Sequence, residues 1–271
     1  MYTILLPVDR DVDRAISQAE YVERLTDVDG EYKVTVLHVS SLGAISDEDE
    51  EFSNVDSAVA VVDLLEEIEL DVTRSVEGGP VAETISEVAD NLDVDEIVMG
   101  GRKRSGMAQV LLGSTVYEVM ISTDKPVTIT GKEVTLGTGS YEVLVSVDRD
   151  VDRALAQARY VTTLPNAAAE VSATVLYVFP HLDYKGAPPH EFDEIDAAVQ
   201  AADSLEDAGV SVERVAIGGE VERKILETGD DLDVDTIVMG GRKRSSVRKV
   251  LLGSTVRDVM LSADRPITLV G

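Results

Sequence analysis

The sequence contains no cysteine and no tryptophan, and only 3 of its 271 residues are phenylalanine. The absence of cysteine excludes disulfides, thiolate metal sites and cysteine nucleophiles. No apolar run approaches the roughly 18 residues that a membrane-spanning helix needs. The first residues, MYTILLPVDRDVDR, carry no basic leader, so we expect no signal peptide and a cytoplasmic location.

Basic residues are also scarce. Lys and Arg together number 24 against 52 Asp and Glu, which gives a formal net charge of −28. Such a charge repels nucleic acids and anionic membranes, because binding to either requires positive charge. It suits a cytoplasm of molar salt, where charge repulsion is screened within roughly 3 Å. The composition therefore predicts a protein of an extreme halophile with no nucleic-acid or membrane partner; an acidic mesophilic protein is the alternative.

The chain contains two copies of one unit. The octapeptide VDRDVDRA occupies residues 8–15 and again 147–154, an offset of 139, and MGGRKRS recurs at an offset of 140. This period is too long for a solenoid, whose repeats are roughly 20–50 residues. The sequence therefore predicts two domains, residues 1–132 and 141–271, joined by a Gly/Thr/Ser-rich linker at 133–140.

Each copy alternates short β-branched runs with segments of helical spacing. In the first copy the predicted strands are residues 3–8, 33–39, 71–76, 96–99 and 126–130. In the second copy they are residues 142–147, 172–179, 210–216, 236–239 and 266–270. Continuous apolar strands such as VTVLHV indicate a parallel sheet with helices on both faces. The pattern predicts two doubly wound α/β domains, whose ligands bind beyond the C-terminal ends of the strands.

Three helix starts carry specific signals. Pro80 precedes apolar residues at helical spacing, so it is predicted to open a helix in its first turn. Ser114 and Ser254 follow glycine and precede TVYEVM and TVRDVM, so each is predicted to cap the last helix of its copy. A helix N-terminus has unpaired N–H groups and a partial positive charge, which together favour anions.

A glycine-rich basic loop precedes each of these last helices. Gly100-Gly101 and Gly240-Gly241 fall where the fourth strand ends, and glycine permits a close approach that a Cβ would block. Arg-Lys-Arg follows in both copies, and the second loop adds two further basic residues. We predict a phosphate site in each copy, with tighter binding in the second; the alternative is ion pairing with acidic neighbours, at roughly 0–1 kcal/mol a pair.

Several catalytic motifs are absent. The sequence has no G-x-x-x-x-G-K-[ST] motif and no G-x-G-x-x-G after its first strand, which excludes Walker-type and Rossmann dinucleotide sites. It also has no nucleophile elbow. The three histidines lack the spacing of metal ligands, and His38 is predicted to be a satisfied core or rim residue. We therefore predict no catalytic residues and no metal site.

With these residues in place, the chain resembles the universal stress protein family in its tandem form, over nearly all of its length. Members of that family carry G-x2-G-x9-G-[ST] after the fourth strand, which binds the ribose and phosphates of ATP or a related adenine nucleotide. The first and third glycines and the serine of that motif are present in both copies here, whereas lysine replaces the second glycine in both.

The resemblance implies an adenine-nucleotide alpha-hydrolase-like fold, with a five-stranded parallel sheet of order 3-2-1-4-5 in each copy. It implies that the fifth strands pair across the two-fold axis of an intramolecular pseudo-dimer, to which a further homodimer can be added. It also places Asp9 and Asp148 near the adenine, although each is equally a candidate N-cap of the following helix. The implied nucleotide-binding residues are Asp9, Val39, Met99, Gly100, Gly101, Arg102, Lys103, Gly113, Ser114, Thr115, Asp148, Val178, Met239, Gly240, Gly241, Arg242, Lys243, Gly253, Ser254 and Thr255.

The function that the resemblance implies is regulatory. The protein would bind ATP, ADP or AMP, with Mg²⁺ allowed beside the phosphates, and couple stress or energy state to partner interactions. Two alternatives stay open: a nucleotide-free dimeric module that binds anions or acidic partners, and a slow ATP hydrolase. Because the sequence shows no base with metal-binding carboxylates beside the basic loops, we predict that the protein is not an enzyme.

Overall fold

The computed structural model describes residues 1–40, 51–101, 113–131, 133–180, 191–244 and 247–271, with the backbone alone for 242–244 and 247–251. In the first half the strands are β1 (Tyr2–Val8), β2 (Tyr32–Ser40), β3 (Asp71–Gly78), β4 (Glu96–Gly100) and β5 (Val127–Thr130). In the second half they are β6 (Tyr141–Val147), β7 (Val171–Pro180), β8 (Ser211–Gly219), β9 (Thr236–Gly240) and β12 (Ile267–Val270). Every strand predicted from the sequence is present, with small shifts at its ends.

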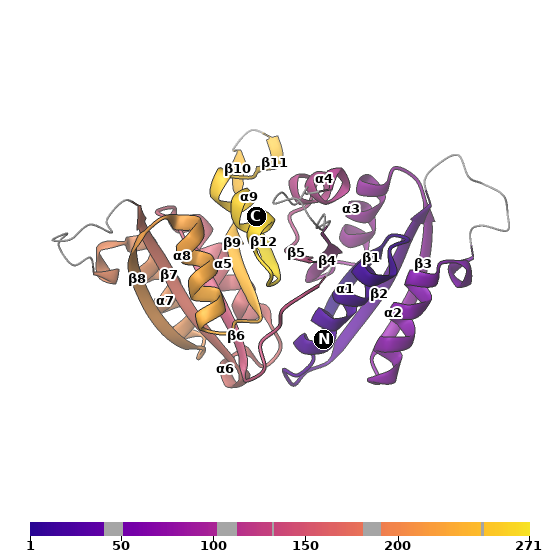
Figure 1. Ribbon diagram of the computed structural model, residues 1–271, viewed down its shortest axis with the longest axis horizontal. Coiled ribbons are helices and arrows are strands. Elements are labelled where there is room, and N and C mark those ends of the chain that lie inside the picture. Colours follow the sequence, from indigo (N-terminus) through magenta and orange to yellow (C-terminus); the bar gives the residue numbers. More distant parts are fainter. Residues whose placement is uncertain (41–50, 102–112, 132, 181–190, 245–246) are drawn as a thin grey trace.

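These strands form one continuous sheet, in the order β3-β2-β1-β4-β5-β12-β9-β6-β7-β8. Within each half the neighbouring strands are parallel and follow the expected order 3-2-1-4-5. At the centre β5 and β12 pair antiparallel, with Thr128 opposite Thr268. The two halves are therefore joined around a pseudo-two-fold axis at this threonine pair, as Figure 1 shows for the middle of the molecule.

A short hairpin lies outside this sheet. The backbone of β10 (Arg242–Arg244) pairs antiparallel with β11 (Val247–Leu251). The sequence predicted a basic loop at this place, so the hairpin corrects that expectation. Neither of its strands, RKR and VRKVL, alternates apolar and polar residues, so the two-residue periodicity of a strand did not predict them.

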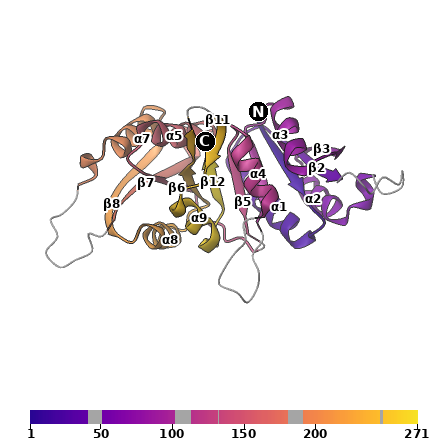
Figure 2. The same ribbon diagram turned by 90° about the horizontal axis from the view of Figure 1, so that it is seen from above.

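Helices cover both faces of the sheet (Figure 2). They are α1 (Val12–Leu25), α2 (Asp56–Glu67), α3 (Val81–Asn91), α4 (Ser114–Ser122), α5 (Val151–Thr163), α6 (Ala167–Glu170), α7 (Asp196–Asp207), α8 (Val221–Asp231) and α9 (Ser254–Ser262). The buried side chains of α1, α2, α5 and α7 form one apolar layer, and those of α3, α4, α8 and α9 form the other. Along β2, Val34 and Val36 face the first layer and Leu37 the second, as expected for a strand buried on both sides. None of the helices in the described ranges combines the length and apolar character that a bilayer crossing requires.

The N-caps of α1 and α5 differ from the candidates in the sequence. Asp11 caps α1, because its carboxylate accepts the backbone N–H of Arg14 at 3.2 Å. Asp9, the expected candidate, lies two residues earlier and accepts the N–H of Asp11 at 2.9 Å. The second copy repeats this arrangement, with Asp150 as the cap and Asp148 before it. Asp9 and Asp148 are thus left outside the helices, at the ends of their strands.

The caps of α4 and α9 were also predicted wrongly. Ser114 and Ser254 are already the first helical residues, and the cap positions are Gly113 and Gly253. Glycine has no side chain that could accept from the first turn, so neither helix has a side-chain cap. Helix α3 likewise begins one residue after Pro80, which occupies its cap position. The open N-termini of α4 and α9 become important at the site.

A polar cluster is buried where the two halves meet. The Glu96 carboxylate, at the start of β4, is fully buried and accepts hydrogen bonds from the hydroxyls of Tyr2 at 3.0 Å and Tyr21 at 2.9 Å, and from Thr128. The Thr128 hydroxyl lies 2.7 Å from that of Thr268 in the other half. Burial raises the pKa of the Glu96 carboxyl, and these hydrogen bonds oppose the rise.

The segment 133–140 lies along the second half. The N–H of Thr135 donates to the carbonyl of Asp264 at 3.0 Å, and the N–H of Gly137 donates to the Asp235 carboxylate at 2.9 Å. Thr138 donates from its backbone to Asp233 at 3.2 Å. The connecting segment is therefore fixed to the second half by hydrogen bonds.

Candidate functional site

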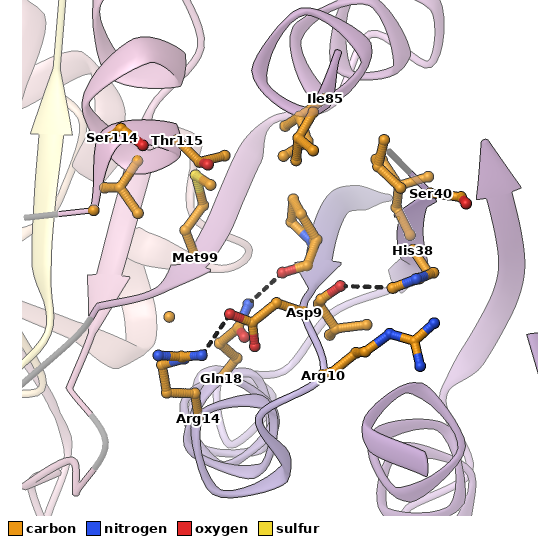
Figure 3. A pocket seen from close by; sticks show the side chains of 18 residues that line it. Asp9, Arg10, Arg14, Gln18, His38, Ser40, Ile85, Met99, Ser114 and Thr115 are labelled. Carbon is orange, nitrogen blue, oxygen red and sulfur yellow. Dashed lines mark hydrogen bonds and ion pairs between the residues drawn. The ribbon is translucent and has the colours of Figure 1, made fainter. Parts of the chain in front are cut away.

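A cavity of about 450 Å³ opens at the C-terminal ends of β1, β2 and β4. Strand order reverses between β1 and β4, so the helices that follow them leave on opposite faces of the sheet and make a crevice there. The walls of the cavity come from these strand ends, from α1 and α3, and from the start of α4 (Figure 3). An equivalent cavity of about 230 Å³ opens in the second half.

Most of the residues predicted to bind nucleotide meet in these two cavities. In the first half the lining includes Asp9, Val39, Met99, Gly100, Gly113, Ser114 and Thr115. In the second half it includes Asp148, Val178, Met239, Gly240, Gly253, Ser254 and Thr255. Gly101 and Gly241 do not line the cavities; each donates its N–H to the last strand of its half, to the carbonyl of Thr130 or Val270, at 2.7 Å.

The structure does not describe the side chains of the predicted basic residues. Arg102 and Lys103 lie outside the described residues, and Arg242 and Lys243 are described only by their backbone in β10. The contribution of these side chains to phosphate binding therefore stays a prediction.

Gly100 and Gly101 allow β4 to end in close contact with its neighbours. A Cβ on Gly100 would lie 3.1 Å from Oε1 of Gln18 and 3.2 Å from Cβ of Arg14. A Cβ on Gly101 would lie 3.0 Å from the carbonyl oxygen of Thr130. A side chain at either position would require its neighbours to shift by a few tenths of an ångström, and glycine avoids that shift.

The Asp9 carboxylate is held at the mouth of the cavity by an ion pair with Arg14 (Figure 3). The Arg14 side chain is 13% exposed and that of Asp9 is 49% exposed, so the pair lies between protein and solvent. Asp148 and Arg153 form the same pair in the second half. The pair holds the Asp9 carboxylate at the cavity mouth as a hydrogen-bond acceptor.

Gln18 is a site residue that the sequence analysis missed. Its side chain is buried, and Nε2 donates to the carbonyls of Pro7 on β1 at 2.9 Å and Val98 on β4 at 2.8 Å. Both carbonyls lie beyond the last paired residues of the β1–β4 ladder, so the amide bridges the two strands under the cavity. Gln157 makes the equivalent bridge in the second half. A glutamine at the same helical position in both copies, in RAISQAEY and RALAQARY, was the available signal.

The N-terminus of α4 forms one end of the first cavity. The first helical N–H with a backbone partner is that of Tyr117, which donates to the carbonyl of Gly113 at 3.0 Å. The N–H groups of the residues before it, Ser114 to Val116, have no helical partner, and no side chain of the described residues is seen to cap them. Free amides, the helix dipole and the hydroxyls of Ser114 and Thr115 make this end suited to an anion.

The other end of the cavity is lined mainly by apolar side chains and lies beside β2. Its wall includes Val39, Val81 and Ile85, and Figure 3 shows Ile85 and the β2 residues on the side away from α4. His38 is buried, and its Nδ1 donates to the carbonyl of Val8 at 3.1 Å, which confirms the expected satisfied role. Arg10 completes the lining at the mouth. The cavity thus combines an anion-binding end with an apolar slot, as small-molecule sites commonly do.

Comparison with known proteins agrees with this arrangement. The profile of the Universal stress protein family matches residues 1–131 and 142–271. The curated Universal stress protein MJ0577 of Methanocaldococcus jannaschii is 30% identical over 66 residues, which are 24% of this chain and 41% of that protein. The chain therefore spans less than half the length of that curated relative.

Two solved structures match the whole fold. A universal stress protein from Archaeoglobus fulgidus has a TM-score of 0.69 at 24% identity, covering 99% of this chain and 97% of its own. The functionally unknown protein PA1789 from Pseudomonas aeruginosa has a TM-score of 0.63 at 17% identity, covering 100% and 92%. These likenesses show that the paired two-half architecture is shared. Since the family profile matches both halves almost completely, the chain belongs to the universal stress protein family, with one family unit in each half.

Proposed function

We propose that this protein is a regulatory protein that binds an adenine nucleotide at the C-terminal ends of its strands. The observation that carries this proposal is the cavity of about 450 Å³, with an uncapped helix N-terminus at one end and an apolar slot at the other. Its volume falls within the roughly 300–1,000 Å³ of small-molecule sites. The shape suits a flat base joined to phosphate, and membership of the family favours adenine.

The phosphate end relies on short-range contacts. The free amides and hydroxyls of Ser114 and Thr115 are placed to donate to phosphate oxygens, and the predicted Arg102 and Lys103 would add charge. In molar salt, attraction between charges extends over only roughly 3 Å. Binding under those conditions therefore depends on direct hydrogen bonds more than on the net charge of the surroundings.

The base end offers a free strand edge. The β1–β2 ladder ends at Val8 and His38, whereas β2 continues beside β3. The carbonyl of Ser40 accepts the N–H of Gly79, on the β3 side. Because successive residues of a strand turn their backbone groups to opposite neighbours, the N–H and C=O of Val39 turn toward the side where β1 has ended. These two groups are suited to bond the edge of an adenine ring.

The arrangement of the site favours nucleotide binding over nucleotide hydrolysis. Asp9 is engaged by Arg14. His38 donates from Nδ1 to the carbonyl of Val8, which leaves Nε2 able to accept a proton, but His38 lies on β2, away from the helix N-terminus where the phosphates are proposed to bind (Figure 3). We therefore propose that the protein holds the nucleotide without hydrolysing it. Nucleotide occupancy would then act as the signal.

Strand β4 offers a route from the site to the junction of the halves. It runs from Glu96 in the buried polar cluster to Gly100 at the cavity, a span of about 13 Å at the usual rise of a strand. The N–H of Gly101 donates directly to Thr130 at the end of β5, which pairs with β12. We propose that a bound nucleotide alters partner interactions through this strand pair.

The test is calorimetry of the full chain with AMP, ADP and ATP in molar KCl, with and without Mg²⁺, together with analysis of nucleotide that co-purifies with the protein. Saturable binding of an adenine nucleotide is the expected result. Absence of binding, with heat on addition of inorganic phosphate, would support the nucleotide-free anion-binding module instead. Steady release of phosphate from ATP would contradict the non-enzymatic role and favour the hydrolase.

A further inference from the structure

The two cavities are built from equivalent residues but differ in volume, about 450 Å³ in the first half and about 230 Å³ in the second. The helix starts, glycines, ion pairs and bridging glutamines are the same residue types in both. The larger differences lie at the ends of β2 and β7, where His38 and Ser40 correspond to Tyr177 and Phe179. The second copy therefore has two aromatic rings where the first has smaller polar side chains.

Tyr177 is fixed in the wall of the second cavity by contacts on two sides. Its ring lines the cavity, is 6% exposed and packs edge-on against Phe179, with ring centroids 4.8 Å apart and an interplanar angle of 78°. Its hydroxyl accepts a hydrogen bond from Nε of Arg149 at 2.9 Å. A phenol held by a neighbouring ring and by a guanidinium does not swing away at low cost.

Arg10 of the first copy, which corresponds to Arg149, makes different contacts. Arg10 lines the first cavity and forms no hydrogen bond or ion pair with another residue of the described ranges. His38 bonds back to the carbonyl of Val8 on β1, so its ring stays against the strand (Figure 3). At the wall position of Tyr177 the first cavity thus has the smaller ring of His38, without the bond to a neighbouring arginine that fixes Tyr177 in the second.

The space lost in the second copy is the space that a base requires. Phosphate binds at the helix N-terminus, so the base must lie at the opposite end, beside β2 or β7. The first cavity lies within the roughly 300–1,000 Å³ of small-molecule sites, and the second lies below that range. Tyr177 stands at this narrowed end.

We propose that the two copies have different ligands. The first cavity takes the whole adenine nucleotide, and Tyr177, held by Arg149 and Phe179, excludes the base from the second, so one chain binds one nucleotide. This inference rests on the nucleotide-binding function proposed for the first cavity. The sequence analysis predicted tighter binding in the second copy because its loop is more basic. The inference is the opposite, because basic side chains strengthen phosphate binding but do not enlarge the space for the base.

The first experiment uses the unmodified chain. Calorimetry with AMP in molar KCl is expected to give one nucleotide per chain, and photoreactive azido-AMP is expected to label peptides of residues 1–131 alone. Two equivalent sites, or equal labelling of both halves, would overturn the inference while the proposed function stands. Failure to bind AMP at all would overturn the proposed function and this inference with it.

The second experiment exchanges the wall residues. The variant Tyr177→His with Phe179→Ser gives the second copy the residues of the first and is expected to raise the stoichiometry to two nucleotides per chain. The reciprocal variant, His38→Tyr with Ser40→Phe, is expected to abolish the single site. Thermal unfolding of both variants checks that they fold. A folded first variant that still binds one nucleotide would contradict the role of Tyr177, and the labelling of the unmodified chain decides between the copies if either variant fails to fold.

Discussion

The guanidinium of Arg24 donates to both carboxylate oxygens of Asp235, from Nε at 2.7 Å and from Nη2 at 3.0 Å. Arg24 belongs to α1 of the first half, and the fully buried Asp235 precedes β9 of the second. The same carboxylate accepts the N–H groups of Gly137 and Glu142, each at 2.9 Å. One aspartate therefore joins the first half, the connecting segment and the second half. The second copy has Thr163 in place of Arg24, so this bond is made on one side of the pseudo-two-fold axis.

Removal of Arg24 should destabilise the chain strongly. The variant Arg24→Ala is expected to lower the free energy of unfolding by about 3–5 kcal/mol, because it leaves a buried carboxylate without its cationic partner. Urea unfolding in molar KCl, followed by circular dichroism, measures the loss. The matched control is Arg74→Ala, which removes an exposed pair with Glu66 and is expected to cost less than about 1 kcal/mol. Equal losses in the two variants would show that Asp235 does not depend on Arg24.

The buried Glu96 predicts a pH-dependent stability. Burial raises its pKa above the ordinary value of 4.5, so within the window between that value and the raised pKa the folded chain binds more protons than the unfolded chain. The contribution of Glu96 to stability therefore falls as pH rises through this window. The free energy of unfolding of Glu96→Gln, minus that of the parent, is expected to increase with pH above 4.5 and then level off.

The measurement for Glu96 is a series of urea unfolding curves at different pH values. Taking the difference between variant and parent cancels the titration of the many other acidic residues. The control is Glu87→Gln, at an exposed position of α3, which measures how far the exchange of a surface Glu for Gln by itself alters the unfolding curves. A difference for Glu96→Gln that does not change with pH would mean that its carboxyl titrates in the folded chain as it does in the unfolded one.

A side chain at Gly113 should block the phosphate end. A Cβ at this position meets no atom of the described residues within 4 Å, and Gly113→Val places its methyl groups beside the first amides of α4. The affinity for AMP is expected to fall roughly tenfold or more, equivalent to about 1.4 kcal/mol. The control is Gly139→Val, which also meets no atom within 4 Å and lies away from the cavity. Unchanged affinity in a folded Gly113→Val variant would count against the site.

Salt should stabilise the protein. Because the chain carries a formal net charge of −28, lowering KCl from molar to about 0.1 M extends the screening length from roughly 3 to 10 Å and strengthens repulsion between carboxylates. The melting temperature is expected to fall as KCl is lowered, measured by circular dichroism. Sucrose at matched osmolality serves as the control for effects other than charge. A melting temperature that is independent of KCl would contradict the halophilic interpretation.

The alternation of strands and helices was predictable because it depends on local patterns. Apolar runs such as VTVLHV placed the strands within a few residues, and the repeat of VDRDVDRA showed that one unit occurs twice. The order of the strands and the pairing of β5 with β12 came from resemblance to the family, since spacing alone does not choose among sheet orders.

The errors in the sequence analysis have a common physical origin. Asp9 and Asp11 are both plausible caps of α1, and the choice depends on which carboxylate the backbone turns toward the first helical amides. At Ser114 the predicted cap was one residue late, although the helix N-terminus had been predicted as an anion site. The bridging role of Gln18 could not be predicted from the sequence, because it depends on two carbonyls from strands far apart in the chain.

The sequence by itself determined that this protein is two copies of one α/β unit, with an acidic surface and glycine-rich strand ends, because period, charge and glycine content are properties of short segments. Only the tertiary structure decided which copy has the larger cavity and how the halves meet: Tyr177, bonded to Arg149, lines the smaller cavity, and Arg24 meets Asp235 across the halves. These contacts join elements that folding brings together. Their effects depend on distance and burial, which the order of residues does not contain.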